Sequence, residues 1–244
     1  MKCSLKIGHL FSDLLNMYGD KGNIASLKKR MEWRGFEAIV HSHKQGEKID
    51  FFEYDIILLG GGGEKDELLA LSLLAQQKEE LKAYIEQGGV MLCLCGGLLM
   101  LGDYYKTKEK NIPALGILDI THEIDERFIG NVVAELQLNG ETLKIAGFEN
   151  HAARLNIKGY EPFAKVITGN GNNANDKNEG LVYKNLFGTF LHGPILPKNP
   201  KLTDYILAKA IEKKYGEVPK LSPLCDDVEN EAHDYAIKRF SGEM

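Results

Sequence analysis

Cys95 is the residue whose type and surroundings most strongly indicate chemistry. It follows the apolar run Val90–Leu94 and precedes Gly96 and Gly97 and a further apolar segment with helical character. A strand, a sharp turn and a helix in this order are typical of a nucleophile elbow, in which the residues two before and two after the nucleophile must be small. Those residues are Cys93 and Gly97. The pattern therefore predicts that Cys95 is a nucleophile on a strained turn.

The same turn would place the Cys95 thiol at the beginning of a helix, where partial positive charge and free N–H groups stabilise a thiolate. We therefore expect its pKa to be lowered. Cys93 lacks this setting, since it lies inside the predicted strand and is followed by Leu94. The alternative is that Cys95 is a small buried core residue, as many free cysteines are.

A thiol nucleophile that must also protonate a leaving group needs a nearby base, most often a histidine. Among the seven histidines, His192 ends a short apolar strand in residues 188–194 (GTFLHGP). Strand ends at the carboxyl edge of a parallel sheet are where such sites collect. His151, in the segment 148–151 (FENH), is the second candidate. The remaining five have no comparable setting: His9, His41, His43, His122 and His233.

Four consecutive glycines, residues 60–63, follow the apolar run 54–59. A phosphate-binding P-loop would continue with Lys and Ser or Thr, whereas this chain continues with Glu64 and Lys65, so phosphate binding is disfavoured. Backbone N–H groups of such a loop can instead stabilise an oxyanion, together with the N–H of Gly96. The alternative is a tight turn without a role in chemistry.

The elements around these residues alternate apolar runs with helical patterns, which is typical of an α/β fold with a mainly parallel central sheet flanked by helices. The expected strands are Ser4–Leu10, 37–40, 54–59 and Val90–Leu94, and the expected helices are one around 24–31 that ends at Gly35 and one over 64–87 that ends at Gly88. After residue 110 the pattern changes to an antiparallel extension, with a hairpin of 132–138 and 142–146 around Asn139 and Gly140.

The C-terminal part is expected to hold a mobile, polar surface loop over 169–180, where Asn172 and Asn173 are not predicted to form a site. Two helices, 202–215 and 226–240, are expected to close the chain. Since no long linker or internal repeat interrupts this order, we expect residues 1–244 to form a single domain.

Composition limits the possible functions. The 244 residues include 30 basic and 35 acidic side chains, a formal net charge of −5, which disfavours binding to nucleic acid. The longest apolar runs are too short to span a bilayer, and the N-terminal sequence lacks the pattern of a signal peptide. Four cysteines in such a chain do not indicate a disulfide framework. We therefore expect a cytoplasmic protein.

The order of the motifs 60–63 (GGGG), 95–97 (CGG) and 191–194 (LHGP) resembles the class I glutamine amidotransferases, on the branch that includes the cobyric acid synthase amidotransferase domain. Four further segments resemble a narrower group, the glutamine-hydrolysing subunits of lipid II isoglutaminyl synthases. They are 13–23 (DLLNMYGDKGN), 127–131 (RFIGN), 147–151 (GFENH) and 188–194 (GTFLHGP).

This resemblance implies hydrolysis of glutamine to glutamate and ammonia. Cys95 would attack the side-chain amide to form a thioester, and His192 would activate the thiol and protonate the departing ammonia. Gly96 and Gly62 would supply the oxyanion hole, and Arg127 would hold the substrate. A guanidinium can bind both oxygens of the carboxylate that glutamine carries.

The resemblance also implies a heterodimer with a Mur-ligase-like partner of the MurT type. That partner would receive the ammonia and amidate the α-carboxyl of D-glutamate in lipid II, with ATP and magnesium bound by the partner. We expect this chain to have no cofactor or metal of its own. A lipid-linked substrate would bring the complex to the inner face of the membrane.

Three positions depart from the common class I pattern. Cys93 replaces a glycine, and Leu99 replaces a glutamine. Pro194 stands where class I members with a catalytic triad of cysteine, histidine and glutamate have the glutamate. Either the pair of Cys95 and His192 suffices, or a carboxylate comes from elsewhere, such as the partner.

Three alternatives remain. The chain could serve an amidotransferase with another acceptor, such as a cobyrinic-acid-like substrate, although such enzymes carry their synthetase domain on the same chain. It could be a catalytically silent binding module, for which Leu99 and Pro194 argue. A metal site of Cys93, Cys95 and His192 is disfavoured, because structural zinc sites use CxxC-type spacing.

Overall fold

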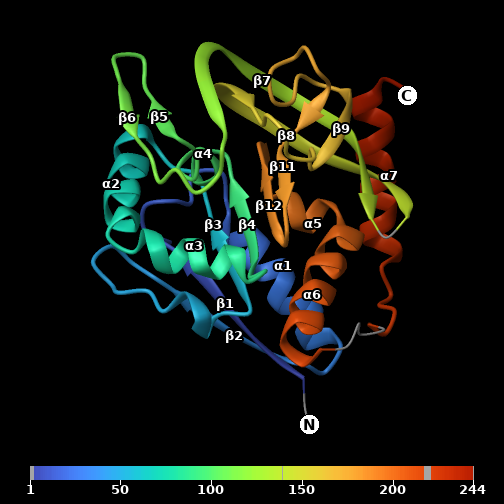
Figure 1. Ribbon diagram of the computed structural model, residues 1–244. Helices are drawn as coiled ribbons and strands as arrows, with labels where there is room; N and C mark the ends of the chain where they lie inside the picture. The colour runs from blue at the N-terminus through green and yellow to red at the C-terminus, as the bar shows by residue number, and fades with distance from the viewer. Residues whose placement is uncertain (1–2, 139, 217–220, 244) are drawn as a thin grey trace.

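The computed structural model describes residues 3–138, 140–216 and 221–243. Its centre is a six-stranded sheet in the order β11-β12-β4-β3-β1-β2, in which all neighbours are parallel except β11 and β12 (Figure 1). The strands are β1 Ser4–Leu10, β2 Glu37–Ser42, β3 Ile56–Leu59, β4 Val90–Leu94, β11 Leu181–Tyr183 and β12 Leu186–Thr189. This confirms the predicted α/β fold with a mainly parallel sheet.

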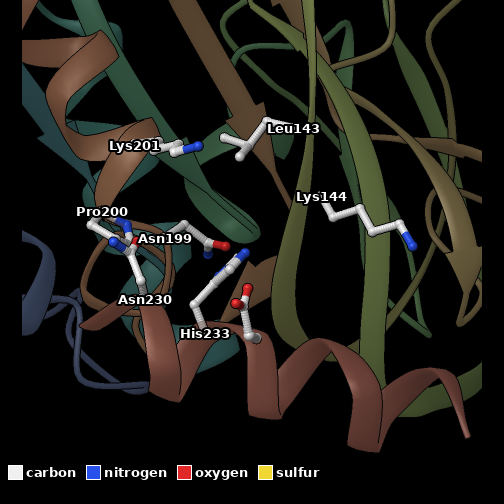
Figure 2. A pocket seen from close by; sticks show the side chains of 8 residues that line it. Leu143, Lys144, Asn199, Pro200, Lys201, Asn230 and His233 are labelled. Carbon is white, nitrogen blue, oxygen red and sulfur yellow. The ribbon is translucent and has the colours of Figure 1, made fainter. Parts of the chain in front are cut away.

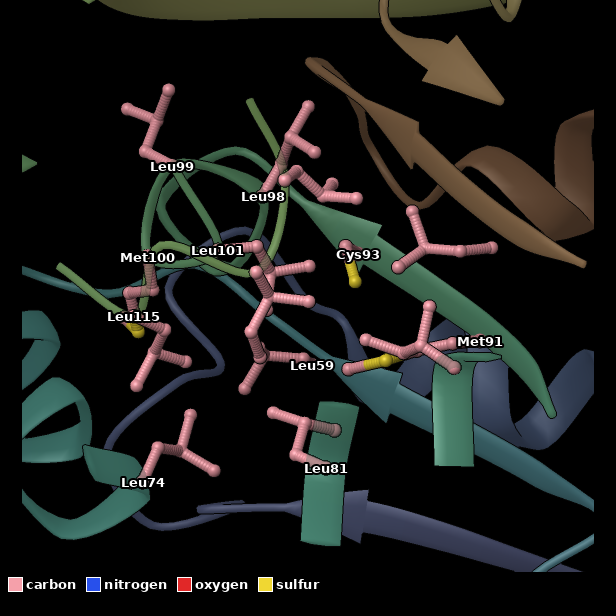
Figure 3. Close-up of a cluster of buried hydrophobic side chains, with 14 of the residues drawn as sticks. Leu59, Leu74, Leu81, Met91, Cys93, Leu98, Leu99, Met100, Leu101 and Leu115 are labelled. Atoms are coloured by element: carbon pink, nitrogen blue, oxygen red, sulfur yellow. The ribbon is translucent and has the colours of Figure 1, made fainter. Parts of the chain in front are cut away.

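Helices cover both faces of this sheet, because residues along each buried strand alternate between the two faces. Leu59, Met91 and Cys93 contribute to the cluster under α2 Glu64–Ala75 and α3 Lys78–Glu86, as Figure 3 shows. Ile57 belongs to the same cluster. The neighbouring strand positions, such as Leu58, pack in a second cluster under the other helices. Those helices are α1 Lys21–Trp33, α5 Ile195–Lys198 and α6 Pro200–Tyr215.

The antiparallel extension is a five-stranded sheet in the order β10-β9-β7-β8-β13. Its strands are β7 Thr121–Leu138, β8 Glu141–Asn156, β9 Ala164–Thr168, β10 Asn178–Glu179 and β13 Leu191–His192. Helix α7 Asp227–Ser241 lies beside this sheet (Figure 1). Its Ile237 packs with Val133 and Ala146 of the sheet. The predicted hairpin is confirmed by the pairing of β7 with β8, although Asn139 lies outside the described residues.

The remaining elements are short. A two-stranded hairpin of β5 Tyr104–Lys106 and β6 Asn111–Pro113 follows α4 Gly96–Leu99, and a 3-10 helix, η1, spans Phe51–Glu53. The hairpin of β5 and β6 matters for the site, because Tyr105 points from it toward α2, where its hydroxyl group donates a hydrogen bond to Glu67.

Two sequence predictions were wrong. The helix expected over 64–87 is two helices, since Gln77 leaves the helical path at φ −127° and its side-chain oxygen accepts a hydrogen bond from the Ile49 N–H at 2.9 Å. The segment 169–180 is not a surface loop throughout. Asn172 is fully buried, and its side chain bonds both the N–H and the carbonyl of Gly180 at 2.7 and 3.0 Å.

Candidate active site

Cys95 lies on the predicted elbow, between β4 and α4. Its backbone has φ 49° and ψ −112°, a conformation that costs free energy for a residue other than glycine and is typical of functional turns. The turn is held by the Cys95 N–H, which donates to the Thr189 carbonyl at 2.9 Å. A Cβ at Gly97 would lie 2.4 Å from the Leu59 carbonyl oxygen, so this position must be glycine. The elbow geometry is therefore as predicted.

The glycine loop is fixed by Asp20. The Gly61 N–H donates to the Asp20 carboxylate at 3.0 Å, and a Cβ at Gly60 would lie 2.5 Å from the same oxygen. Asp20 is fully buried, and burial raises its pKa to about 6. A Cβ at Gly61 would lie 3.4 Å from the Cys95 Cβ, so the loop runs directly beside the elbow.

Glu67 on α2 is a residue of this site that the sequence analysis missed. Its Oε1 accepts a hydrogen bond from the Gly62 N–H at 2.9 Å, and its Oε2 accepts one from the Tyr105 hydroxyl. A Cβ at Gly96 would lie 2.0 Å from the Glu67 Oε1, so the carboxylate lies directly against the backbone of Gly96. Of the two backbone positions that were predicted as oxyanion-hole donors, Gly62 therefore donates to this carboxylate, and Gly96 packs against it through its Cα.

The predicted lowering of the Cys95 pKa was wrong. Burial raises the pKa of the Cys95 thiol, and the neighbouring Glu67 carboxylate raises it further. The Gly96 N–H and Arg127 act in the opposite direction but are outweighed. The helix that follows the thiol, α4, has only four residues and therefore a weak dipole. The thiol is thus protonated in this structure.

Arg127 reaches the site from β7. The pairing of β7 with β8 shifts register between Ile124 and Phe128, and this bulge redirects the intervening side chains. The Arg127 Nη1 donates to the carbonyl and to the side-chain oxygen of Asn150 at 3.1 and 3.0 Å. Its guanidinium is exposed and lines the same cavity as Cys95, so it can bind an incoming carboxylate.

His192 lies at the end of β13 and is 1% exposed. Neither of its ring nitrogens has a hydrogen-bond partner among the described residues, and no hydrogen bond joins it to Cys95. Its ring lies against Tyr18, with centroids 4.1 Å apart. Burial, together with the nearby His151, lowers the pKa of His192 to about 3, so the imidazole is neutral.

His151, the second candidate, lies on β8 and lines the cavity itself. Its Nδ1 donates to the Ala153 carbonyl at 3.0 Å, and its ring stacks on Phe190 with centroids 4.0 Å apart. Burial lowers its pKa to about 4. Since Nδ1 carries the proton, Nε2 is left as an acceptor, and it has no partner within the described part of the chain.

The segment that carries His192 is held by a second buried carboxyl group, Glu179. At the break between β12 and β13, the Glu179 Oε1 accepts the Phe190 N–H at 2.7 Å, and both of its oxygens lie within 3.0 Å of the Thr189 Oγ1. Burial raises the pKa of Glu179 to about 8, which the charge of Glu149 reinforces. Glu179 therefore fixes the point where the chain passes from one sheet to the other.

One cavity of about 250 Å³ thus brings together most of the predicted site. Cys95, Gly62, Gly96 and Arg127 line it, and the additional lining residues include Tyr18, Glu67, Leu99, Tyr105 and His151. His192 is not among the lining residues and contacts the site through Tyr18. Glu67 had a weak signal in the sequence, as an acidic residue one helical turn after the glycine loop.

A larger cavity of about 420 Å³ lies between α7 and β8, and Figure 2 shows its lining. It includes Lys144, Lys201 and His233, whose Nδ1 is bonded to the Lys198 carbonyl at 2.8 Å. None of the predicted site residues lines this cavity. The metal alternative also lacks support, because the Cys93 side chain points into the apolar cluster (Figure 3), and the residues described contain no group of three metal-ligating side chains.

Comparison with known proteins gives the family to which a chain with this fold and this cavity belongs. Residues 6–200 match the CobB/CobQ-like glutamine amidotransferase domain. The chain therefore belongs to the CobB/CobQ-like glutamine amidotransferase family.

Two curated relatives cover most of the chain. It is 43% identical over 212 residues to the GatD subunit of the glutamine-hydrolysing lipid II isoglutaminyl synthase of Staphylococcus aureus, covering 86% of each protein. It is 37% identical over 228 residues to the subunit of the same name from Streptococcus pneumoniae, covering 92% of this chain and 86% of that one.

The fold is also found among solved structures. The structure of PurLQS from Thermotoga maritima has a chain that matches with a TM-score of 0.56 at 17% identity, and the match covers 89% of this chain and all of the other. Within the described residues, no helix has the length and apolar character needed to cross a membrane.

Proposed function

We propose that this chain is the glutaminase subunit of a lipid II isoglutaminyl synthase. The observation that carries the proposal is the strained Cys95 in a small cavity that the exposed Arg127 also lines. The two curated GatD relatives, each similar over 86% of its own length, support the choice of this enzyme among amidotransferases.

Glutamine would bind with its α-carboxylate on Arg127 and its side-chain amide over Cys95. The sulfur attacks the amide carbon while the thiol proton passes to His192. The resulting oxyanion is stabilised by the backbone N–H groups of Gly62 and Gly96. Collapse of the intermediate breaks the C–N bond, and the imidazolium returns its proton to the nitrogen, which leaves as ammonia.

The product of this step is a thioester between glutamate and Cys95. Water attacks the thioester carbon, gives up a proton to His192, and the thiolate leaves and regains that proton. Glutamate is released, and the thiol is restored. The overall reaction converts glutamine and water to glutamate and ammonia, so it consumes no cofactor in this chain.

The ammonia would pass to a Mur-ligase-like partner of the MurT type in a 1:1 heterodimer. That partner would use ATP and magnesium to activate the α-carboxyl of D-glutamate in lipid II. Neither nitrogen of His192 has a partner among the described residues. Either a catalytic pair of Cys95 and His192 suffices, or the second subunit supplies a carboxylate, which requires a rearrangement around an imidazole that is 1% exposed in this chain.

The test is glutamate release by the purified chain, with and without the co-purified partner, for the wild type and for Cys95→Ala. We expect release that depends on Cys95 and increases with the partner. Mass analysis of the complex from native lysate should give a 1:1 heterodimer with a Mur-ligase-like protein. A solitary monomer would count against the partner assignment.

A catalytically silent binding module is the second candidate, because the Cys95 thiol is protonated and the Gly62 N–H is already bonded to Glu67. The same assay separates the two. If glutamate release does not depend on Cys95 with or without the partner, the chain is a binding module. Glutamine binding measured by calorimetry would then persist and would still require Arg127.

A further inference from the structure

The Glu67 carboxylate occupies the place that a reacting amide oxygen would need. Its Oε1 takes the hydrogen bond of the Gly62 N–H at 2.9 Å. A Cβ at Gly96 would lie 2.0 and 2.4 Å from Oε1 and Oε2, so the carboxylate packs against the Cα of Gly96, whose N–H acts on the Cys95 sulfur. Because an oxyanion hole works through donors aimed at a developing negative charge, a carboxylate bonded to the Gly62 N–H competes directly with the oxyanion.

The position of this carboxylate is fixed from a second element. Glu67 belongs to α2, whereas Tyr105, which donates its hydroxyl hydrogen to Oε2, belongs to the hairpin of β5 and β6. Both side chains are buried, each with 6% of its surface exposed, although they line the cavity. Glu67 is thus bonded on one oxygen by the glycine loop and on the other by the hairpin.

Building on the proposed function, we propose that Glu67 is an internal stopper of the oxyanion hole. The amide oxygen of glutamine must displace its carboxylate from the Gly62 N–H before Cys95 can attack, and Tyr105 holds the stopper in its closed position. The chain by itself therefore rests in a closed state. Opening requires Glu67 to leave Gly62, and the hairpin that carries Tyr105 is the element that can release it.

The closed state also suppresses the nucleophile. A carboxylate against Gly96 lies beside the sulfur and disfavours the thiolate. Displacing Glu67 would therefore free the Gly62 N–H and favour ionisation of Cys95 in one movement. This coupling would prevent hydrolysis of glutamine when no acceptor is available to use the ammonia.

The test uses three variants of the purified chain. Glu67→Ala removes the stopper, Glu67→Gln keeps an oxygen that can accept the Gly62 N–H, and Tyr105→Phe removes only the hydroxyl that holds Glu67. The matched control is Glu80→Ala, an exposed glutamate on α3. We expect kcat/KM for glutamine hydrolysis to rise about tenfold in Glu67→Ala, which corresponds to about 1.4 kcal/mol of barrier. Tyr105→Phe should rise less. Glu67→Gln should also rise less than Glu67→Ala, because it removes the charge beside Cys95 but keeps an acceptor for the Gly62 N–H, while the control should stay close to wild type.

A second measurement does not depend on turnover. Labelling of Cys95 is followed by mass spectrometry with two reagents, iodoacetamide and a chloroketone analogue of glutamine, with Cys95→Ala as the blank. Only the chloroketone places a carbonyl oxygen between Gly62 and Gly96. Loss of the stopper should therefore accelerate labelling by the chloroketone several-fold more than labelling by iodoacetamide.

Several results would contradict the proposal that Glu67 blocks the oxyanion hole. These are a loss of activity in a folded Glu67→Ala, an equal rise in Glu67→Gln and Glu67→Ala, or equal acceleration with both reagents. If Glu67→Ala does not fold, as judged by thermal unfolding, an unchanged labelling ratio in Tyr105→Phe has the same meaning. Absence of any Cys95-dependent glutamate release from the wild type with its partner is a different result, which refutes the proposed function.

Discussion

The phenol ring of Tyr18 lies against the imidazole of His192, with centroids 4.1 Å apart and planes tilted by 34°. Tyr18 lines the cavity that contains Cys95, and its hydroxyl donates to the Asn150 carbonyl at 3.3 Å. With no hydrogen bond on either nitrogen of His192 among the residues described, this packing contact is what orients the imidazole.

Tyr18→Ala is therefore expected to lower kcat for glutamine by about tenfold to a hundredfold, because small misplacements of a catalytic group have effects of this size. Tyr18→Phe keeps the ring and should remain within about threefold of wild type, since it removes the hydroxyl with its weak bond to Asn150 but not the contact with His192. Steady-state kinetics of the two variants provide the comparison. Equal losses in both would show that the hydroxyl, and not the ring, carries the effect.

The two buried histidines can be separated by substitution. His192→Ala should lower kcat/KM by about a hundredfold or more, the range for loss of a general base, whereas His151→Ala should cost less. His233→Ala, in the distant cavity of Figure 2, is the control. Glutamate release measured at saturating and low glutamine gives the values. A larger loss in His151→Ala would assign the base to the histidine that lines the cavity.

The two neighbouring cysteines are expected to behave differently. Cys95→Ala should abolish glutamate release with little change in the free energy of unfolding. Cys93→Ala should retain activity but lose about 1 kcal/mol of stability, because its side chain is fully buried in the apolar cluster of Figure 3. Urea unfolding and the activity assay on both variants check this. Loss of activity in a stable Cys93→Ala would implicate both thiols.

Arg127→Lys should raise KM for glutamine about tenfold with a smaller change in kcat. A lysine keeps the charge but loses the paired donors that can bind both carboxylate oxygens, and this contact is equally strong in the ground and transition states. Kinetics with glutamine supply the KM. An effect confined to kcat would mean that Arg127 contacts the reacting atoms and not the α-carboxylate.

Glu179 should make stability depend on pH. Because burial raises its pKa from 4.5 to about 8, the folded state holds a proton that the unfolded state releases between these pH values. Its contribution is therefore fully present below about pH 4.5 and is lost as the pH rises toward 8. Glu179→Gln cannot ionise, so its unfolding free energy relative to wild type should increase from pH 5 to pH 8.5. Urea unfolding at four pH values tests this, and a constant difference would contradict it.

Much of the fold could be predicted because local patterns agree with the tertiary structure. The bounds of β1 and β4 match the apolar runs seen in the sequence, and Gly35, Gly88 and Gly216 end their helices with positive φ, as glycines there should. The wrong predictions depend on contacts between distant segments. Gln77 leaves its helix to bond Ile49, a partner 28 residues away, and no local pattern signals this.

In the candidate site, too, local patterns could be predicted from the sequence, whereas contacts between distant segments could not. The elbow at Cys95 could be predicted from adjacent residues, because the glycines and the strand are consecutive. The raised pKa of the thiol could not, since it results from burial and from Glu67, which comes from another element. Similarly, the polar segment 169–180 suggested a surface loop, but Asn172 and Glu179 are buried because they satisfy backbone groups of other segments. That residues 1–244 form one domain stays a prediction.

The strand that carries His192 leaves the parallel sheet after Thr189 and pairs with β8 in the antiparallel sheet, while Cys95 directly follows β4 of the parallel one. Thiol and imidazole therefore belong to two separate layers, and their spacing is set by how those layers pack. A protein that binds to the long strands β7 and β8 would move the imidazole while the sulfur stays in place. Control of this reaction would then need no second binding pocket, only a displacement of the antiparallel sheet relative to the parallel one.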